Sequence, residues 1–148
     1  MTKHVQYALI VSDFNQDITQ ELLSGAADEL KQHGVPISDI AVFHVPGAIE
    51  LPLVAKWCAK SEKFVAIICL GAVIQGETDH YQYVCQQVSY GCQHVMLTHE
   101  VPVIFGVLTV KTEEEAKARI GGQHGHKGRE AALAAIHMAE LAGQLTSV

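Results

Sequence analysis

The chain has 148 residues, 49% of them hydrophobic, and a formal net charge of −6 at pH 7. The length predicts one domain spanning residues 1–148, and the apolar fraction predicts a packed core with further apolar area for subunit contacts. The negative charge argues against a nucleic-acid partner, since it repels phosphates, and no apolar run reaches the roughly 18 residues that cross a membrane.

Four apolar runs, at residues 7–12, 40–45, 64–72 and 103–109, predict β-strands. The third run begins FVAIICL and lacks strict alternation of apolar and polar residues. Such a run is typical of a strand that is buried on both faces, as in a parallel sheet.

Five helices are predicted between and after these strands. The first runs from an N-cap at Asp17 to Gly34, a residue type that favours the C′ position. Thr112 and Glu115 form a capping box at the start of the fourth, which ends near residue 120. The other three are predicted from the PGAIELP turn to about residue 60, over residues 79–98 and over residues 127–145.

The alternation of strands and helices predicts an α/β fold, a three-layer α/β/α sandwich around a flavodoxin-like four-stranded parallel sheet. We expect the strand order 2-1-3-4, with helices on both faces of the sheet. In such sheets ligands bind beyond the carboxyl ends of the strands. This rule brings together four segments, at residues 14–15, 47–50, 73–80 and after Thr109.

The segment after the third strand combines features of an anion site and of a proton-transfer site. Gly76 turns the chain, and Glu77 and Thr78 lead to His80 at the start of the long helix. Unpaired N–H groups at a helix start favour an anion, and a histidine carries protons near neutral pH. The alternative for His80 is a surface or capping histidine. The segment is neither a Walker A loop nor GxGxxG, so no bound nucleoside triphosphate is expected.

Two side chains in the other loops are candidates for holding a substrate. Phe14 lies in a polar loop, where it either offers a stacking surface to a flat heterocycle or folds back on the core. Glu50, near a helix start, is able to accept hydrogen bonds from sugar or polyol hydroxyls. Five of the ten Lys and Arg residues, including both arginines, fall between residues 111 and 129, which indicates either a small anionic ligand or a solvated helix face.

Other kinds of site have less support. His124 and His126 lie two apart in a glycine-rich link, but no CxxC, HExxH or carboxylate cluster accompanies them, so we expect no metal. Four cysteines without a CxxC, and first residues without a signal peptide, predict reduced, buried thiols in a cytoplasmic protein. Two other classes of protein with this fold do not match. A response regulator needs a phosphate-accepting Asp at the end of its third strand, and this chain has none there. The loop after the first strand has two acids and no glycine, so it would repel the phosphate that a flavodoxin binds there.

Five segments together resemble the lumazine synthase family, at residues 11–15, 45–52, 70–80, 101–109 and 127–138. They occur in order and at family-like spacing over nearly the whole chain. The resemblance implies condensation of 5-amino-6-ribitylaminouracil with 3,4-dihydroxy-2-butanone 4-phosphate. The products are 6,7-dimethyl-8-ribityllumazine, phosphate and water, in the penultimate step of riboflavin biosynthesis. It also implies no cofactor, no metal, and a homopentamer with active sites between neighbouring subunits.

The resemblance assigns roles to residues already singled out. It implies that His80 transfers protons, with Glu130 as its acidic partner, and that Arg119 holds the leaving phosphate. Phe14 is expected to stack on the pyrimidine ring. The expected substrate contacts on the same subunit are Phe14, Asn15, Ala48, Ile49, Glu50, Ala72, Val73, Ile74, Glu77 and Thr78. Those expected from the adjacent subunit are Phe105, Arg119 and Lys127.

The chain also departs from the family pattern. Gln75 stands where an arginine is usual, Ile49 where an aromatic is usual, and Asp13 where a basic or small residue is common. The link at residues 122–126 differs as well.

Two alternatives to the enzyme remain. One is a non-catalytic module of this fold that binds riboflavin or a lumazine, although such a module needs neither His80 nor Arg119. The other is a shell protein, to whose assembly the short N-terminal arm would add little.

Overall fold

The computed structural model describes residues 6–146, so the N-terminal arm considered for shell assembly lies outside the described part of the chain. Four strands form one parallel sheet in the order β2-β1-β3-β4. They are β1 (Gln6–Ser12), β2 (Ile40–Val45), β3 (Phe64–Ile74) and β4 (Val103–Val110). The predicted α/β fold and the strand order 2-1-3-4 are confirmed.

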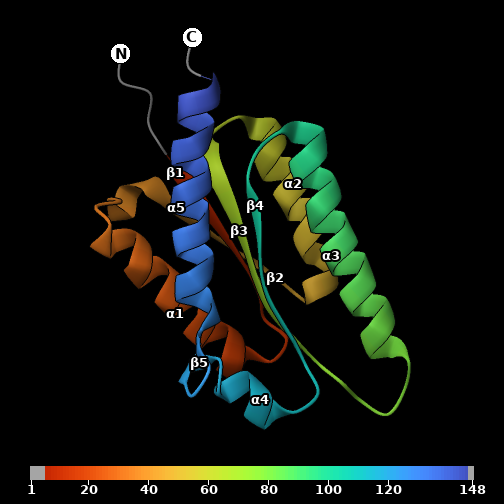
Figure 1. The fold of residues 1–148 in the computed structure, drawn as a ribbon. Coiled ribbons are helices and arrows are strands. Elements are labelled where there is room, and N and C mark those ends of the chain that lie inside the picture. The colour runs from red at the N-terminus through yellow and green to blue at the C-terminus, as the bar shows by residue number, and fades with distance from the viewer. Residues whose placement is uncertain (1–5, 147–148) are drawn as a thin grey trace.

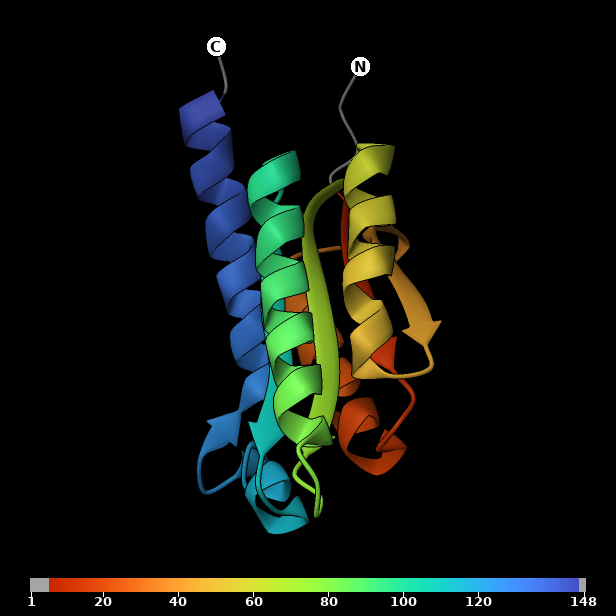
Figure 2. The same ribbon diagram turned by 90° about the vertical axis from the view of Figure 1, so that its right-hand side faces the viewer.

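Helices cover both faces of the sheet, as Figures 1 and 2 show. Helices α1 (Gln16–Gln32) and α5 (Lys127–Thr146) lie on one face, and α2 (Leu51–Ser61) and α3 (His80–His99) lie on the other. The shorter elements are η1 (Ile37–Asp39), η2 (Ala48–Glu50), α4 (Glu113–Lys117), β5 (Ile120–Gly122) and β6 (Gly125–His126). Helix α4 and the β5–β6 hairpin lie at the end of the sheet where β4 ends (Figure 1).

The two faces of the central strands supply two separate cores. Leu9 and Ile68 pair across β1 and β3 and pack toward α1 and α5. The next pair, Ile10 and Cys69, points to the opposite face and packs toward α2 and α3. Successive side chains of a strand alternate between faces, so two apolar cores require an unbroken apolar sequence. This requirement explains the FVAIICL run of β3.

The first helix begins differently from the prediction. Asn15 adopts the left-handed conformation (φ 62°), and α1 begins at the next residue, Gln16. The predicted N-cap at Asp17 is therefore wrong, because Asp17 already lies in the first helical turn. Asparagine tolerates the left-handed region better than most residues, so a tight turn after β1 is possible without glycine.

The region after β4 also differs from the prediction. The short helix ends at Lys117 rather than near Ile120, because Ile120 pairs with His126 in an antiparallel hairpin that was not predicted. Only half of the expected capping box forms. The Thr112 hydroxyl accepts a hydrogen bond from the Glu115 N–H at 3.1 Å, whereas the Glu115 carboxylate accepts one from the Lys111 N–H.

The structure also shows the state of the cysteines and whether any described helix could cross a membrane. All four cysteines are free thiols, and Cys58, Cys69 and Cys92 are buried as predicted, whereas Cys85 is only half-buried. Burial raises the pKa of the Cys58 thiol to about 11. Within residues 6–146, no helix combines the length and the apolar character needed to cross a membrane.

Candidate active site

A cavity of about 420 Å³ opens at the carboxyl ends of β1 and β3, beside η2 and the start of α3. It brings together nine of the residues proposed from the sequence. They are Phe14, Asn15, Ala48, Ile49, Ala72, Val73, Ile74, Thr78 and His80. Gly47, Gly76, Tyr81 and Val84 complete the lining. We call this space the ring cavity, because its lining is mostly apolar and carries the exposed Phe14 ring.

Hydrogen bonds to two neighbouring strands hold the loop that carries Phe14. The Asp13 and Phe14 N–H groups donate to the carbonyls of Val45 and Pro46, at 2.8 and 3.0 Å. The Asn15 amide donates to the Ala72 carbonyl at 2.9 Å. The loop is thus fixed, yet the Phe14 side chain is 71% exposed. Phe14 does not fold back on the core, so its ring is free to stack on a ligand.

Helix η2 forms a second wall of the ring cavity. Ala48 is buried at its base, and the Ile49 side chain is 45% exposed. Glu50 does not line the cavity. Its Oε1 atom accepts a hydrogen bond from the Gly47 N–H at 2.8 Å, which stabilises the turn after β2. The sequence indicates for Glu50 only a favourable charge near a helix start and a ligand contact, and this hydrogen bond was not predicted from it.

The third wall is the end of β3 and the start of α3. β3 continues past Ala72 to Ile74, where it pairs with the end of β4. The chain then turns through Gly76 to His80, the first residue of the long helix α3. The His80 N–H donates to the Thr78 hydroxyl at 3.3 Å, and the His80 side chain is exposed. The start of a 20-residue helix thus faces the cavity with Thr78 and His80, while Glu77 lies outside its lining.

Tyr81 and Val84 also line the ring cavity, although neither was predicted as a site residue from the sequence. The Tyr81 hydroxyl interacts with Cys85 and Thr109, and burial raises the pKa of the phenol. Tyr81 is therefore a neutral hydrogen-bonding group near neutral pH. The position of Tyr81 next to His80 could have identified it as a cavity residue, because the first turn of α3 faces the carboxyl edge of the sheet.

A second cavity, of about 270 Å³, lies on the other side of β4. We call it the basic cavity, because it contains Arg119, His124 and Lys127 together with Glu130. The remaining lining comes from β4, at residues 107–110. Phe105 lines neither cavity and instead packs, half-buried, against the core under α2 and α3. The structure thus separates Arg119, Lys127 and Phe105 from the ring cavity within one chain.

Arg119 and Lys127 are held close together, and within residues 6–146 neither has a carboxylate partner. One guanidinium nitrogen of Arg119 donates to the Glu115 carbonyl at 2.8 Å, and the Lys127 N–H donates to the Arg119 carbonyl at 2.8 Å. Among the described residues, neither side chain takes part in an ion pair. Their charges are therefore available to an anion entering the basic cavity.

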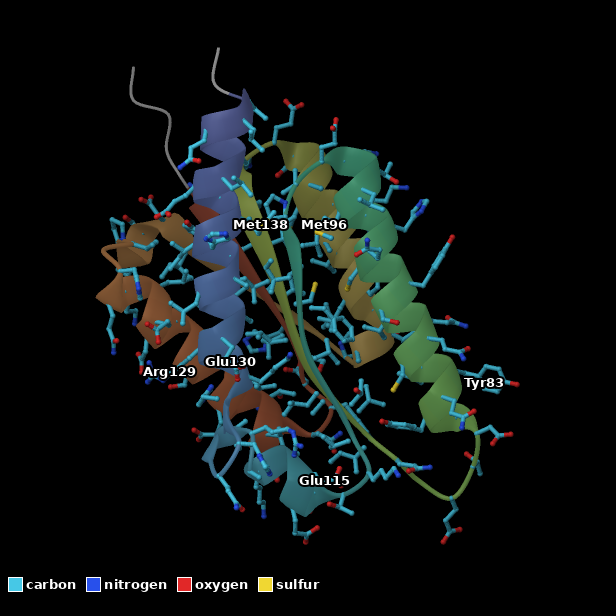
Figure 3. All side chains as sticks on the ribbon, in the orientation of Figure 1. Tyr83, Met96, Glu115, Arg129, Glu130 and Met138 are labelled. Atoms are coloured by element: carbon cyan, nitrogen blue, oxygen red, sulfur yellow. The ribbon has the colours of Figure 1, made fainter. Side chains whose placement is uncertain are left out.

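The other arginine has a different environment. Arg129 lies 3.5 Å from Asp28 and 3.6 Å from Glu29, both on α1, and its side chain is 37% exposed. Figure 3 shows Arg129 on the α1 side of α5, whereas Glu115 lies in α4 at the base of the fold. Of the basic cluster seen in the sequence, Arg119 and Lys127 therefore fit an anion site, and Arg129 joins helices α1 and α5.

The two histidines of the glycine-rich link do not act as a pair. His124 lines the basic cavity, whereas the Nδ1 atom of His126 accepts hydrogen bonds from the N–H groups of Gly128 and Arg129. In the described part of the chain, no group of three His, Cys, Asp or Glu side chains is arranged to hold a metal ion.

Comparisons with known proteins point to one family. The family model described as "6,7-dimethyl-8-ribityllumazine synthase" matches residues 4–143. Among curated proteins, the 6,7-dimethyl-8-ribityllumazine synthase of Coxiella burnetii (strain RSA 493 / Nine Mile phase I) is 55% identical over 134 residues, 90% of this chain and 89% of that protein. The protein of the same name from Salinibacter ruber is 48% identical over 140 residues, 95% of this chain and 90% of its own length.

Proposed function

The chain belongs to the 6,7-dimethyl-8-ribityllumazine synthase family, and we propose that its ring cavity and basic cavity are the two halves of the active site. The protein is a transferase of riboflavin biosynthesis. Its reaction condenses 5-amino-6-ribitylaminouracil with 3,4-dihydroxy-2-butanone 4-phosphate to 6,7-dimethyl-8-ribityllumazine, releasing phosphate and water. The observation that supports a site in two halves is that the exposed Phe14 ring lines one cavity, whereas Arg119 and Lys127 line the other.

The ring cavity suits the pyrimidine substrate. Phe14 stacks on the heterocycle, while Ala48, Ile49 and the end of β3 enclose its edge. Asn15 holds the loop through Ala72 and so positions the stacking face. Glu50 keeps the η2 turn in place through Gly47, and its second carboxylate oxygen is the group we assign to the ribityl hydroxyls.

The phosphate of the second substrate needs a cation that the ring cavity lacks. No Lys or Arg is among the residues that line the ring cavity, whereas Arg119 and Lys127 line the basic cavity. We assign the start of α3, with Glu77 and Thr78, to one side of the phosphate. Arg119, Lys127 and Phe105 of a neighbouring copy supply the other side. A homopentamer provides such contacts in a closed ring. Light scattering that gave the mass of one chain would exclude this arrangement.

The chemistry needs proton transfers and orientation rather than a strong protein nucleophile. An amine adds to a ketone, water leaves, phosphate is eliminated and a ring closes. His80 is exposed at the edge of the ring cavity, where it is able to move protons between these groups. Glu130 of the neighbouring copy, in the basic cavity beside Arg119, is the acidic group we place near His80. Holding both substrates in reactive geometry supplies much of the acceleration.

Replacing His80 tests the proton-transfer role. We expect His80→Ala to lower kcat about 10²-fold, the lower end of the range for general acid–base catalysis, because water can replace part of the transfer. Product formation is followed by the absorbance and fluorescence of the lumazine. His94→Ala, an exposed histidine on the same helix, is the matched control and should keep the wild-type rate. A folded wild type that binds riboflavin but shows no rate above background would favour the non-catalytic binding module instead.

Replacing Phe14 tests the stacking role. We expect Phe14→Ala to raise KM for the ribitylaminouracil about tenfold, because stacking on an aromatic side chain contributes roughly 1–3 kcal/mol. KM for the phosphorylated butanone should change little, since that substrate has no ring. Phe14→Tyr keeps the aromatic face and serves as the control. An equal rise in both KM values for Phe14→Ala would contradict a specific stacking role.

A further inference from the structure

The His126 ring fills a notch between helices α1 and α5. A Cβ atom added to Gly25 of α1 would lie 2.1 Å from the ring's Cε1 atom, and one added to Gly128 of α5 would lie 3.0 Å from the same atom. Two glycines, one on each helix, thus leave the space that the imidazole occupies. The ring is only partly exposed and contacts both helices.

The same ring caps the start of α5. Its Nδ1 atom accepts hydrogen bonds from the N–H groups of Gly128 at 3.1 Å and Arg129 at 3.2 Å. These are the second and third residues of the helix, the N–H groups that an N-cap side chain normally satisfies. An acceptor at Nδ1 requires the neutral ring with its proton on Nε2.

The cap lies next to the basic cavity. Lys127 follows His126 directly, and its N–H donates to the Arg119 carbonyl at 2.8 Å. On the opposite strand of the hairpin, Ile120 pairs with His126 and follows Arg119 directly. The residue that caps α5, His126, therefore lies between the segments that carry Arg119 and Lys127, and close to Glu130 in the first turn of α5.

We propose that His126 is a positioning residue for the phosphate half of the active site. Its neutral imidazole fixes the start of α5 and so places Lys127 and Glu130 against Arg119. Protonation of Nδ1 replaces the acceptor by a donor, removes both cap hydrogen bonds and loosens this arrangement. The proposal rests on the assignment of Arg119 and Lys127 to the phosphate, and it adds a residue that touches no substrate.

The surroundings of the ring favour the neutral form. Burial lowers the pKa of His126, and the nearby positive charge of Arg129 on α5 lowers it further. Glu21 on α1 acts in the opposite direction, through its charge and a backbone hydrogen bond. Arg129 itself is paired with Asp28 and Glu29 of α1.

The direction of this shift sets the pH dependence. The folded-state pKa lies below the ordinary value of 6.5, so above 6.5 the ring is neutral whether the chain is folded or unfolded. As the pH falls below 6.5, the unfolded chain takes up a proton before the folded chain does. Stability is therefore lost as the pH falls from 6.5 through the lower folded value.

The test compares His126→Asn with His126→Ala across pH. Asparagine caps a helix without titrating, so at about pH 8 we expect KM for the butanone phosphate within about twofold of wild type. Alanine provides no cap and should raise that KM about fivefold, with kcat changed less. As the pH is lowered from about 8 through the folded-state pKa of His126, the KM ratio of wild type to His126→Asn should rise towards the roughly fivefold effect of the alanine variant. Because substrate ionisation is common to both enzymes, it cancels in this ratio.

Two outcomes would overturn the proposal. One is a KM ratio of wild type to His126→Asn that stays constant with pH. The other is a proton on Nδ1 near neutral pH, read from the ring nitrogen shifts of ¹⁵N-histidine-labelled protein. The second measurement needs no turnover. If the wild type proves inactive, the proposed function fails, while the nitrogen shifts still decide whether His126 is a neutral cap.

Discussion

Arg119→Ala is expected to lower kcat/KM for the phosphorylated butanone about 10³-fold. Removing one preorganised charge from a site of developing negative charge typically costs 10²–10³-fold, and the role proposed for Arg119 includes phosphate binding before the reaction. The guanidinium is held by the Glu115 carbonyl and has no ion-pair partner within residues 6–146. Its loss therefore removes a positive charge from the basic cavity without freeing a buried carboxylate. Steady-state assays with each substrate varied in turn measure the effect.

The chain offers a matched control in its only other arginine. Arg129→Ala removes the same charge two residues beyond Lys127 on α5, where Arg129 pairs with Asp28 and Glu29 of α1 at partly exposed positions. Exposed ion pairs contribute little, so activity should stay within about twofold of wild type at mildly alkaline pH. Equal losses of activity in the two variants would indicate that net charge, rather than the position of Arg119, governs phosphate binding.

Mixing two impaired variants tests whether the site is shared between copies. In a mixed oligomer of His80→Ala and Arg119→Ala chains, some sites combine the intact His80 of one chain with the intact Arg119 of the next. Random pairing restores about a quarter of the sites, so the mixture should regain a substantial fraction of wild-type activity after joint refolding. A mixture no more active than its separate components would mean that both residues act from the same chain.

The sheet could be predicted from the sequence because each of its strands is marked by a run of apolar residues. An unbroken apolar run bounded by turns predicts a strand covered on both faces, and right-handed crossovers then leave few arrangements. The rule that ligands bind beyond the carboxyl ends of parallel strands places Phe14, Ala48 and His80 at one edge of the sheet. The structure brings these three residues together around one cavity.

The parts that the sequence did not predict depend on contacts that have no local signature. The β5–β6 hairpin forms where Ile120 pairs with His126, and neither residue type distinguishes a hairpin from a loop. The N-cap of α1 is Asn15, in the left-handed conformation, whereas the sequence predicted Asp17. The hydrogen bond from the Gly47 N–H to Glu50 is a local contact, and residue type alone does not show whether that carboxylate serves the turn, a ligand or both.

Gly128→Ala is expected to lower the free energy of unfolding by about 3 kcal/mol, the upper end of the range for overpacking. A Cβ atom at Gly128 would lie 2.2 Å from the Leu22 carbonyl oxygen and 3.0 Å from the His126 ring. The oxygen belongs to the backbone of α1, so relief requires α1 and α5 to move apart. That movement would also shift Lys127 and raise KM for the phosphorylated substrate.

Gly143→Ala provides the control within the same helix. A Cβ atom there would meet nothing within 4 Å, so the substitution brings only the helix propensity of alanine, a gain of up to about 1 kcal/mol. Thermal unfolding should therefore shift in opposite directions for the two variants. The comparison is made at equal protein concentration, because the proposed subunit association would make the midpoint depend on concentration. A midpoint for Gly128→Ala at or above that of the wild type would show that α1 and α5 can separate at this point without loss. The close contact between α1 and α5 would then not determine the position of Lys127. That position would depend on the His126 cap alone.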